Sequence, residues 1–264
     1  MSEALRALGA NSRLCPTRLL APSPESPVVV VDSYSNRPDA LGLDGRAVVA
    51  IDDLERDLDV EVVVDPCPGA RPAEHPSARR VLAGAQFAPL DPGLVRLPRR
   101  SLLAGIQRVL VATGGADRSG RGYAIAEGIA ARCAGIACVR LAVGPGTIVL
   151  DAPGVEIVRC AGGLGPELAQ ADIVVTAGGV TLLEALSLGR PTVVLALYSN
   201  QARQARRAVE LGVAIGADDI DDISAAVDRL SRSVECRTSL SERASEIVDG
   251  RGAFRVAEAV LAVA

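Results

Sequence analysis

The segment from Asp172 to Gln201 constrains the fold of this chain more than any other stretch. Its parts are, in order, an apolar run, a glycine pair, a helix-like segment and a second apolar run (173–175, 178–179, 181–188 and 192–197). Strand, turn, helix and strand in this order are typical of half of a βαβ unit in a parallel sheet. The segment therefore predicts an α/β fold in which one helix begins directly on two glycines.

Polar residues accompany this glycine pair at the spacing of a βαβ unit. Thr181 and Glu184 lie in the first turn and a half of the expected helix, and Asn200–Gln201 follows the second apolar run. The first N–H groups of a helix have no helical partner and carry the positive end of its dipole, so they suit a phosphate. A lone glycine pair more often only turns the chain, but the accompanying Thr, Glu and Asn-Gln favour a ligand site.

The composition excludes several classes of function. The chain has 264 residues, which is enough for one large or two modest domains, and 49 % of them are apolar. Its apolar runs are shorter than the roughly 18 residues that a membrane span needs. A net charge of −4, no Trp, three Tyr and two Phe argue against nucleic acid as a partner. One His and six Cys without a CxxC pair predict no metal site, and we expect a reduced, cytoplasmic protein.

Composition shifts along the chain predict three parts: an irregular segment (1–26), a first α/β lobe (27–98) and a second α/β lobe (104–264). In the first lobe three short apolar runs each end in an acid, at Asp32, Asp52–Asp53 and Asp65. Such runs are typical of successive strands in an open sheet, where ligands bind beyond the carboxyl ends. The acids could equally cap helices or close turns. From residue 108 onward strands and helices alternate, which predicts a doubly wound parallel sheet.

The order and spacing of these segments resemble the PseG/SpsG family of nucleotide-sugar hydrolases over most of the chain. The matching segments are VVVVDSY (28–34), VVAIDD (48–53), VLAGAQFAPLDPGL (81–94), VLVATGGAD (109–117), the 172–201 block and VDGRGAFRV (248–256). The 172–201 block also looks, more distantly, like the nucleotide-diphosphate site of GT-B glycosyltransferases. The resemblance implies two Rossmann-like, doubly wound lobes of the GT-B type, with an incomplete N-terminal lobe.

The resemblance also implies a substrate and a site. The substrate would be a UDP-linked 2,4-diacetamido-2,4,6-trideoxy sugar of nonulosonate or surface-polysaccharide biosynthesis, hydrolysed by attack of water at the anomeric carbon without a cofactor. Tyr34 and Asn200, from opposite lobes, would border the sugar as the catalytic candidates. The nucleotide-binding candidates, all in the second lobe with Glu184 on the ribose, are Gly114, Gly115, Gly178, Gly179, Val180, Thr181, Glu184 and Gln201.

One departure from the family pattern affects the expected chemistry. The family carries its general base, a histidine, in a glycine-rich loop after the first strand, and nothing before Val28 has that pattern. The one histidine, His75, stands in the polar segment RPAEHPS and is expected to be a solvated loop residue. The general base is therefore unassigned. Two alternatives stay open: a nucleotide-sugar-binding protein without turnover, and a GT-B glycosyltransferase with an acceptor hydroxyl in place of water. The exact sugar, the identity of the nucleotide base and the oligomeric state also stay open.

Overall fold

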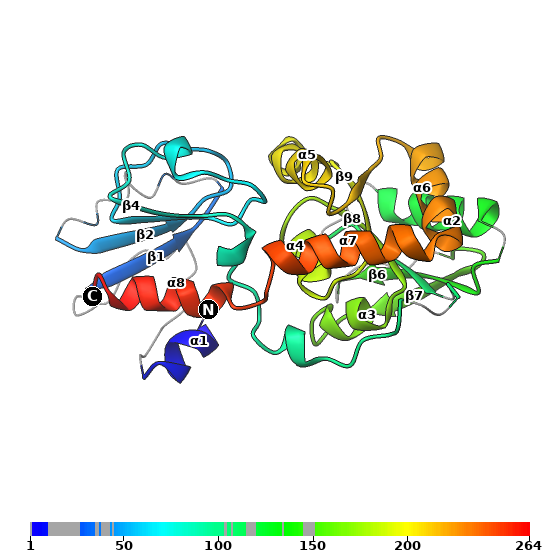
Figure 1. Ribbon diagram of the computed structural model, residues 1–264, viewed down its shortest axis with the longest axis horizontal. Coiled ribbons are helices and arrows are strands. Elements are labelled where there is room, and N and C mark those ends of the chain that lie inside the picture. The colour runs from blue at the N-terminus through cyan, green and yellow to red at the C-terminus, as the bar shows by residue number, and fades with distance from the viewer. Residues whose placement is uncertain are drawn as a thin grey trace. The chain divides into compact units, whose positions relative to one another are not determined.

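The computed structural model describes residues 2–9, 27–34, 37, 43, 45–102, 105–106, 108–114, 120–133, 135–144 and 151–264. The chain forms two compact units (Figure 1). The first unit comprises Met1–Pro92 and Ile247–Ala264, and the second unit comprises Gly93–Glu246. Each unit is built around a parallel sheet with helices packed on it, so the α/β class predicted from the sequence is confirmed.

The sheet of the first unit has four parallel strands that pair in chain order. They are β1 (Val28–Asp32), β2 (Ala47–Ile51), β3 (Val62–Asp65) and β4 (Arg80–Ala83). Valine and isoleucine dominate these strands because β-branched side chains fit a pleated, buried surface. Short 3-10 helices follow β3 and β4, namely η3 (Pro72–Glu74) and η4 (Ala85–Phe87). Within the described residues β1 and β4 are the edge strands of this sheet.

The last helix of the chain, α8 (Gly252–Leu261), covers one face of this sheet together with α1 (Ser2–Ala7) (Figure 1). Six residues of α8 are buried, and four of them, Ala253, Val256, Ala257 and Val260, have the spacing of one helix face. They pack with Val49, Val62, Val64 and Leu82 of the strands. Gly252 permits the close approach of α8 to the segment after η4, since a Cβ there would lie 2.1 Å from the Ala88 carbonyl oxygen. The opposite face packs Ala50 and Val63 against Leu58 and Val60.

The position of α8 corrects the range 104–264 expected for the second lobe, because residues 247–264 belong to the first unit. The apolar stripe of α8 shows in the sequence that this helix needs an apolar surface to cover. It does not show which of two similar valine-rich sheets provides that surface. Only the tertiary packing decides between them.

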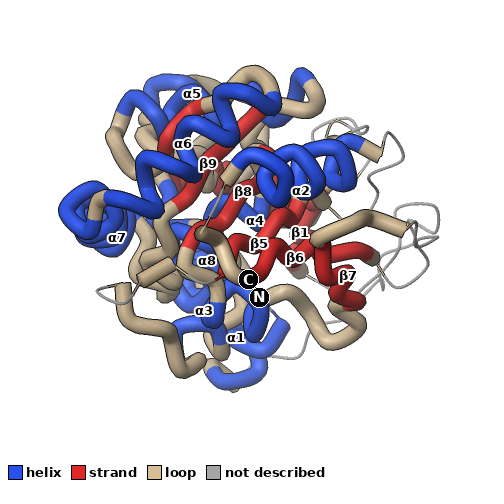
Figure 2. Tube along the Cα trace, turned by 90° about the vertical axis from the view of Figure 1, so that its right-hand side faces the viewer, coloured by secondary structure: helices blue, strands red, loops and turns tan. Residues whose placement is uncertain are grey.

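The second unit contains a six-stranded parallel sheet in the order β10-β9-β8-β5-β6-β7. The strands are β5 (Arg108–Ala112), β6 (Cys138–Val143), β7 (Val155–Arg159), β8 (Ile173–Ala177), β9 (Thr192–Leu195) and β10 (Ile215–Gly216). The chain runs outward from β5 to β7, then returns to place β8 on the other side of β5. Figure 2 shows β9, β8, β5, β6 and β7 side by side. This is the doubly wound Rossmann order, and its direction reverses between β5 and β8.

Helices cover both faces of this sheet because its strands are apolar on both sides. One face, which includes Val109, Val111, Val175 and Val193, packs against α2 (Arg121–Arg132) and α6 (Ile220–Arg232). On the other face α3 (Gly165–Gln170) contacts β5, and α4 (Val180–Ser187) contacts β8 and β9. The remaining elements are η5 (Leu94–Arg96), η6 (Ser199–Gln201), α5 (Ala202–Glu210) and α7 (Val234–Ile247). In the described ranges no helix is long and apolar enough to cross a membrane.

Candidate functional site

The turn between β8 and α4 requires glycine at both of its positions. Gly178 continues the sheet, since its N–H donates to the Leu195 carbonyl at 3.1 Å. A Cβ on Gly178 would lie 2.4 Å from the Gln201 carbonyl oxygen, closer than real contacts allow. Gly179 has φ 135° and ψ −161°, a conformation that residues with a side chain rarely adopt. The glycine pair therefore lets the backbone pass under the Gln201 carbonyl and enter the helix at once.

The N-terminus of α4 has no side-chain cap. The first helical hydrogen bond runs from Leu183 N–H to the Gly179 carbonyl at 3.4 Å, so the N–H groups of Val180, Thr181 and Leu182 precede it. Helix α6 in the same unit is capped in the usual way, because the Asp219 carboxylate accepts the Asp222 N–H at 2.8 Å. Three successive N–H groups at the positive end of a helix dipole suit an anion.

This turn lies at the point where the strand order of the second sheet reverses. The neighbouring strand β5 ends at Ala112, which pairs in register with Thr176 of β8. The buried Thr176 hydroxyl donates to the Ala112 carbonyl at 2.8 Å and ties the two strand ends together. Gly114 follows β5 with φ 109° and open space where a Cβ would stand. Gly115 lies outside the described residues. In doubly wound sheets this switch point is where ligands bind.

The polar candidates on α4 and after β9 lie at the same carboxyl edge of the second sheet. Glu184 is partly buried in the second turn of α4, and Asn200 is partly buried in η6. The Gln201 side-chain oxygen accepts the N–H groups of Leu197 at 3.0 Å and Tyr198 at 3.2 Å. That oxygen therefore stabilises the loop after β9. Val180 exposes 64 % of its surface at the first position of α4.

Gln204 of α5 touches the glycine turn, although the polar sequence around it is typical of an exposed helix. Its side-chain oxygen accepts the Gly179 N–H at 3.0 Å, and the residue is only 2 % exposed. The surrounding stretch, ARQARRAVE, is polar, which is typical of a solvated helix. The one available signal is that Gln204 lies three residues after Gln201, on the same side of the helix start.

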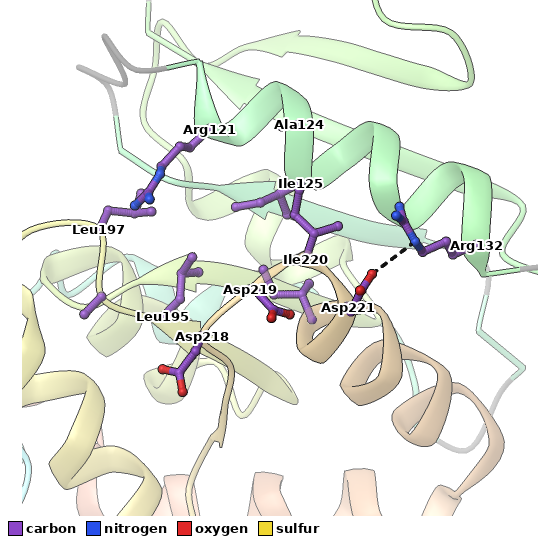
Figure 3. Close-up of a pocket in the computed structure, with 12 residues that line it drawn as sticks. Arg121, Ala124, Ile125, Arg132, Leu195, Leu197, Asp218, Asp219, Ile220 and Asp221 are labelled. Carbon is purple, nitrogen blue, oxygen red and sulfur yellow. Dashed lines mark ion pairs between the residues drawn. The ribbon is translucent and has the colours of Figure 1, made fainter.

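A pocket of about 440 Å³ opens at the carboxyl end of β9, between α2 and the start of α6 (Figure 3). Its apolar lining comes from Ala124, Ile125, Leu195, Ala196, Leu197, Ile220 and Ile223. Its charged lining comes from Arg121, Arg132, Asp218, Asp219 and Asp221. Arg132 pairs with Asp221 at 3.4 Å, and both side chains are largely exposed. Three carboxylates against two guanidinium groups, one of them already paired, make this pocket a poor place for an anion.

Tyr34, the catalytic candidate of the first unit, follows the end of β1. Its hydroxyl donates to the Asp53 carboxylate at 3.4 Å, and the residue exposes 56 % of its surface. Partial burial of the hydroxyl and the negative charges of Asp53 and Asp32 raise the pKa of Tyr34 to about 12. The phenol is therefore protonated at neutral pH and can donate a hydrogen bond, but it cannot accept a proton as a base. Asn200, the other catalytic candidate, belongs to the second unit.

His75 is not the solvated loop residue that its sequence context predicts. It is 1 % exposed, with Nε2 3.0 Å from the Asp65 carboxylate and Nδ1 3.1 Å from the Arg56 carbonyl oxygen. Both neighbours are acceptors, so the protonated ring, which can donate from both nitrogens, fits this environment best. Burial alone would lower the pKa of His75, but the hydrogen bonds to Asp65 and the Arg56 carbonyl outweigh it and raise that pKa. The ring is held in place inside the first unit.

In the residues that the structure places, no three His, Cys, Asp or Glu side chains are grouped so that they could hold a metal ion. The arrangement at the second sheet therefore offers backbone N–H groups, glycine turns and a few polar side chains. Such a site can bind and stabilise negative charge without any group that titrates near neutral pH.

Comparison with known proteins supports the fold. No protein-family model matches the chain. Over 92 residues it is 33 % identical to the spore coat polysaccharide biosynthesis protein SpsG of Bacillus subtilis (strain 168), and this match covers 33 % of the chain and 27 % of SpsG. The matched segment thus spans about a quarter of that relative.

Solved structures resemble the chain over a much larger part of its length. The spinosyn rhamnosyltransferase SpnG in complex with thymidine diphosphate matches with a TM-score of 0.61 and 20 % identity, over 88 % of this chain and 73 % of that one. A putative UDP-N-acetylglucosamine 2-epimerase from Listeria monocytogenes matches with a TM-score of 0.60 and 14 % identity, over 89 % and 73 %. The calicheamicin glycosyltransferase CalG4 matches with a TM-score of 0.51 and 22 % identity, over 77 % of this chain and 52 % of that one. The chain therefore has a GT-B-like fold with Rossmann-like lobes, as predicted.

Proposed function

We propose that this protein binds a UDP-linked sugar with the diphosphate at the start of α4. The observation that carries this proposal is the uncapped helix start behind Gly178 and Gly179, at the switch point of a doubly wound sheet. The N–H groups of Val180, Thr181 and Leu182 would donate to the phosphate oxygens. Glu184, in the next turn, would accept hydrogen bonds from the ribose hydroxyls, as the resemblance to the PseG/SpsG family implies.

Charge distinguishes the glycine turn from the neighbouring pocket as the place for the diphosphate. The pocket at the end of β9 contains the carboxylates of Asp218, Asp219 and Asp221. A diphosphate among them would be repelled, whereas the start of α4 presents three N–H groups and the positive end of the helix dipole. This contrast supports the glycine turn.

We propose hydrolysis as the reaction, following the resemblance to the PseG/SpsG family and the partial match with SpsG. The bond between the anomeric carbon and the β-phosphate oxygen breaks, a water oxygen bonds to that carbon, and one proton passes from the attacking water to bulk water. UDP departs with its charge stabilised by the α4 N–H groups. Neither Tyr34, with its raised pKa, nor His75, with both ring nitrogens engaged, is available to take the proton.

Sugar transfer to an acceptor hydroxyl is the second candidate reaction, and the GT-B-like fold shared with glycosyltransferases favours it. The same glycosidic bond breaks and the same leaving group departs, so the α4 site would serve both reactions. Only the nucleophile differs. A protein that binds the nucleotide sugar without turnover would also keep this site.

Calorimetry with UDP, UMP and uridine tests the binding proposal. We expect UDP to bind with micromolar to millimolar affinity, about −8 to −4 kcal/mol, and more tightly than UMP or uridine. Equal affinity for uridine and UDP would contradict a phosphate site at α4.

Release of UDP from a UDP-linked diacetamido-trideoxyhexose tests the reaction. We expect UDP to be released in water without any acceptor, but slowly, because no general base is assigned. A positioned general base typically raises the rate about 10²–10⁴-fold. Release only after an acceptor sugar is added would favour transfer over hydrolysis. Binding with no release under either condition would leave the binding role alone.

A further inference from the structure

Helix α5 and the residue before it, Gln201 of η6, hold the glycine turn from one side through two contacts. The backbone carbonyl of Gln201 lies directly over Gly178, so that no side chain fits there. The buried side-chain oxygen of Gln204 accepts the Gly179 N–H at 3.0 Å. Glycine has the widest conformational freedom of all residues, so a Gly-Gly turn without such contacts would sample many conformations. The two contacts fix it in one.

The Gln204 contact also decides which N–H groups remain for a ligand. Gly178 N–H bonds to Leu195 and Gly179 N–H bonds to Gln204, so both glycines are satisfied within the protein. The next three N–H groups, of residues 180–182, precede the first helical hydrogen bond. The acceptor at Gly179 is a neutral amide oxygen. A carboxylate in its place would satisfy the same N–H but would add a negative charge beside an anion site.

We propose that Gln204 is a positioning residue for the diphosphate: its neutral oxygen fixes the Gly178–Gly179 turn and leaves the start of α4 attractive to an anion. This inference rests on the proposed function, in which a nucleoside diphosphate occupies that helix start. It assigns to α5 the role of setting the charge preference of the site.

Two substitutions separate the hydrogen bond from the charge. Gln204→Glu keeps an oxygen that can accept the Gly179 N–H and adds one negative charge. Gln204→Leu keeps most of the volume and removes the acceptor. The control is Gln170→Glu, which adds the same charge to the same unit just before β8, at the amino end of the sheet. Circular dichroism at increasing temperature establishes that each variant is folded.

Binding of UDP and of uridine is then measured by calorimetry for all four proteins. For Gln204→Glu we expect UDP affinity to fall about 10- to 100-fold and uridine affinity to change less than about twofold. The loss should shrink at high salt and at acidic pH, where the charge is screened or the carboxyl is protonated. For Gln204→Leu we expect a smaller loss of UDP affinity, and for Gln170→Glu no change.

The outcomes separate the inference from the proposed function. If the wild-type protein binds UDP no better than uridine, the α4 phosphate site is wrong and the role of Gln204 falls with it. If the wild-type protein binds UDP more tightly than uridine and Gln204→Glu keeps this difference in full, the α4 site stands and only the proposed role of Gln204 is wrong. If Gln204→Glu weakens the affinity for UDP and for uridine equally, and the loss does not depend on salt, Gln204 acts only through packing. Should Gln204→Leu fail to fold, Gln204→Glu still decides.

Discussion

Replacing Gly178 by alanine adds one methyl group at the closest backbone approach of the proposed site. The new Cβ would lie 2.4 Å from the Gln201 carbonyl oxygen, whereas real contacts below 3.0 Å are essentially never seen. The backbone of the turn or of η6 therefore has to shift by roughly half an ångström or more, at a cost of about 1–3 kcal/mol in folding stability. The φ angle of Gly178 is one that alanine can adopt, so the cost is purely steric.

The same shift moves the N–H groups of residues 180–182 relative to the rest of the site. We expect UDP affinity to fall at least about tenfold, which corresponds to roughly 1.4 kcal/mol, because hydrogen bonds depend steeply on geometry. The matched control is Gly105→Ala, just before β5, where a Cβ meets nothing within 4 Å. Calorimetry with UDP and urea unfolding followed by circular dichroism measure the two effects. A Gly178→Ala protein with unchanged stability and unchanged UDP affinity would refute this reasoning.

Three further predictions concern single side chains. Glu184→Ala should weaken UDP and uridine binding alike, by about 1–3 kcal/mol, because a charge-assisted hydrogen bond to the ribose is lost; a loss confined to UDP would contradict a ribose contact. Tyr34→Phe should leave the pH profile of turnover between about pH 6 and 9 unchanged, since the pKa of Tyr34 is about 12; a missing limb in the variant's profile would contradict this. His75→Leu should destabilise the first unit by about 3–5 kcal/mol near pH 5, because the buried Asp65 carboxylate loses the ring that it pairs with and keeps the Cys67 N–H as a donor. The pKa of His75 is raised in the folded protein. The His75–Asp65 pair therefore contributes its full stabilisation below the pKa of an unfolded histidine, about 6.5, and this stabilisation is lost as pH rises through the folded pKa. Urea unfolding of both proteins at several pH values measures this, and a wild-type stability that rises with pH through this window would contradict it.

The sequence predicts the second sheet well because local signals agree there. Short apolar runs, each ended by glycine or a polar residue, mark β5, β8 and β9, and the glycine pair marks the start of α4. These features depend on residues close in the chain, where side-chain period and turn chemistry decide the structure. The candidate residues from Gly178 to Glu184 follow from the same local pattern.

Features that depend on distant residues are not visible in the sequence. The burial of His75 requires Asp65 and the Arg56 carbonyl, which the fold of the first unit brings to the ring. The contact of Gln204 with Gly179 joins a polar helix to a turn 25 residues earlier. The placement of α8 on the first sheet is decided by tertiary packing. In each case a polar or amphipathic segment fits more than one environment, and only the assembled fold selects one.

Amide NMR spectra recorded during titration with UDP and with uridine test the central claim most directly, because they report on each backbone N–H separately. We predict that UDP shifts the amide signals of Val180, Thr181 and Leu182 strongly, and that uridine leaves these three nearly unchanged. Saturating shifts that instead cluster on the pocket residues Arg121, Asp218 and Ile220, with residues 180–182 unaffected, would contradict a diphosphate site at the start of α4.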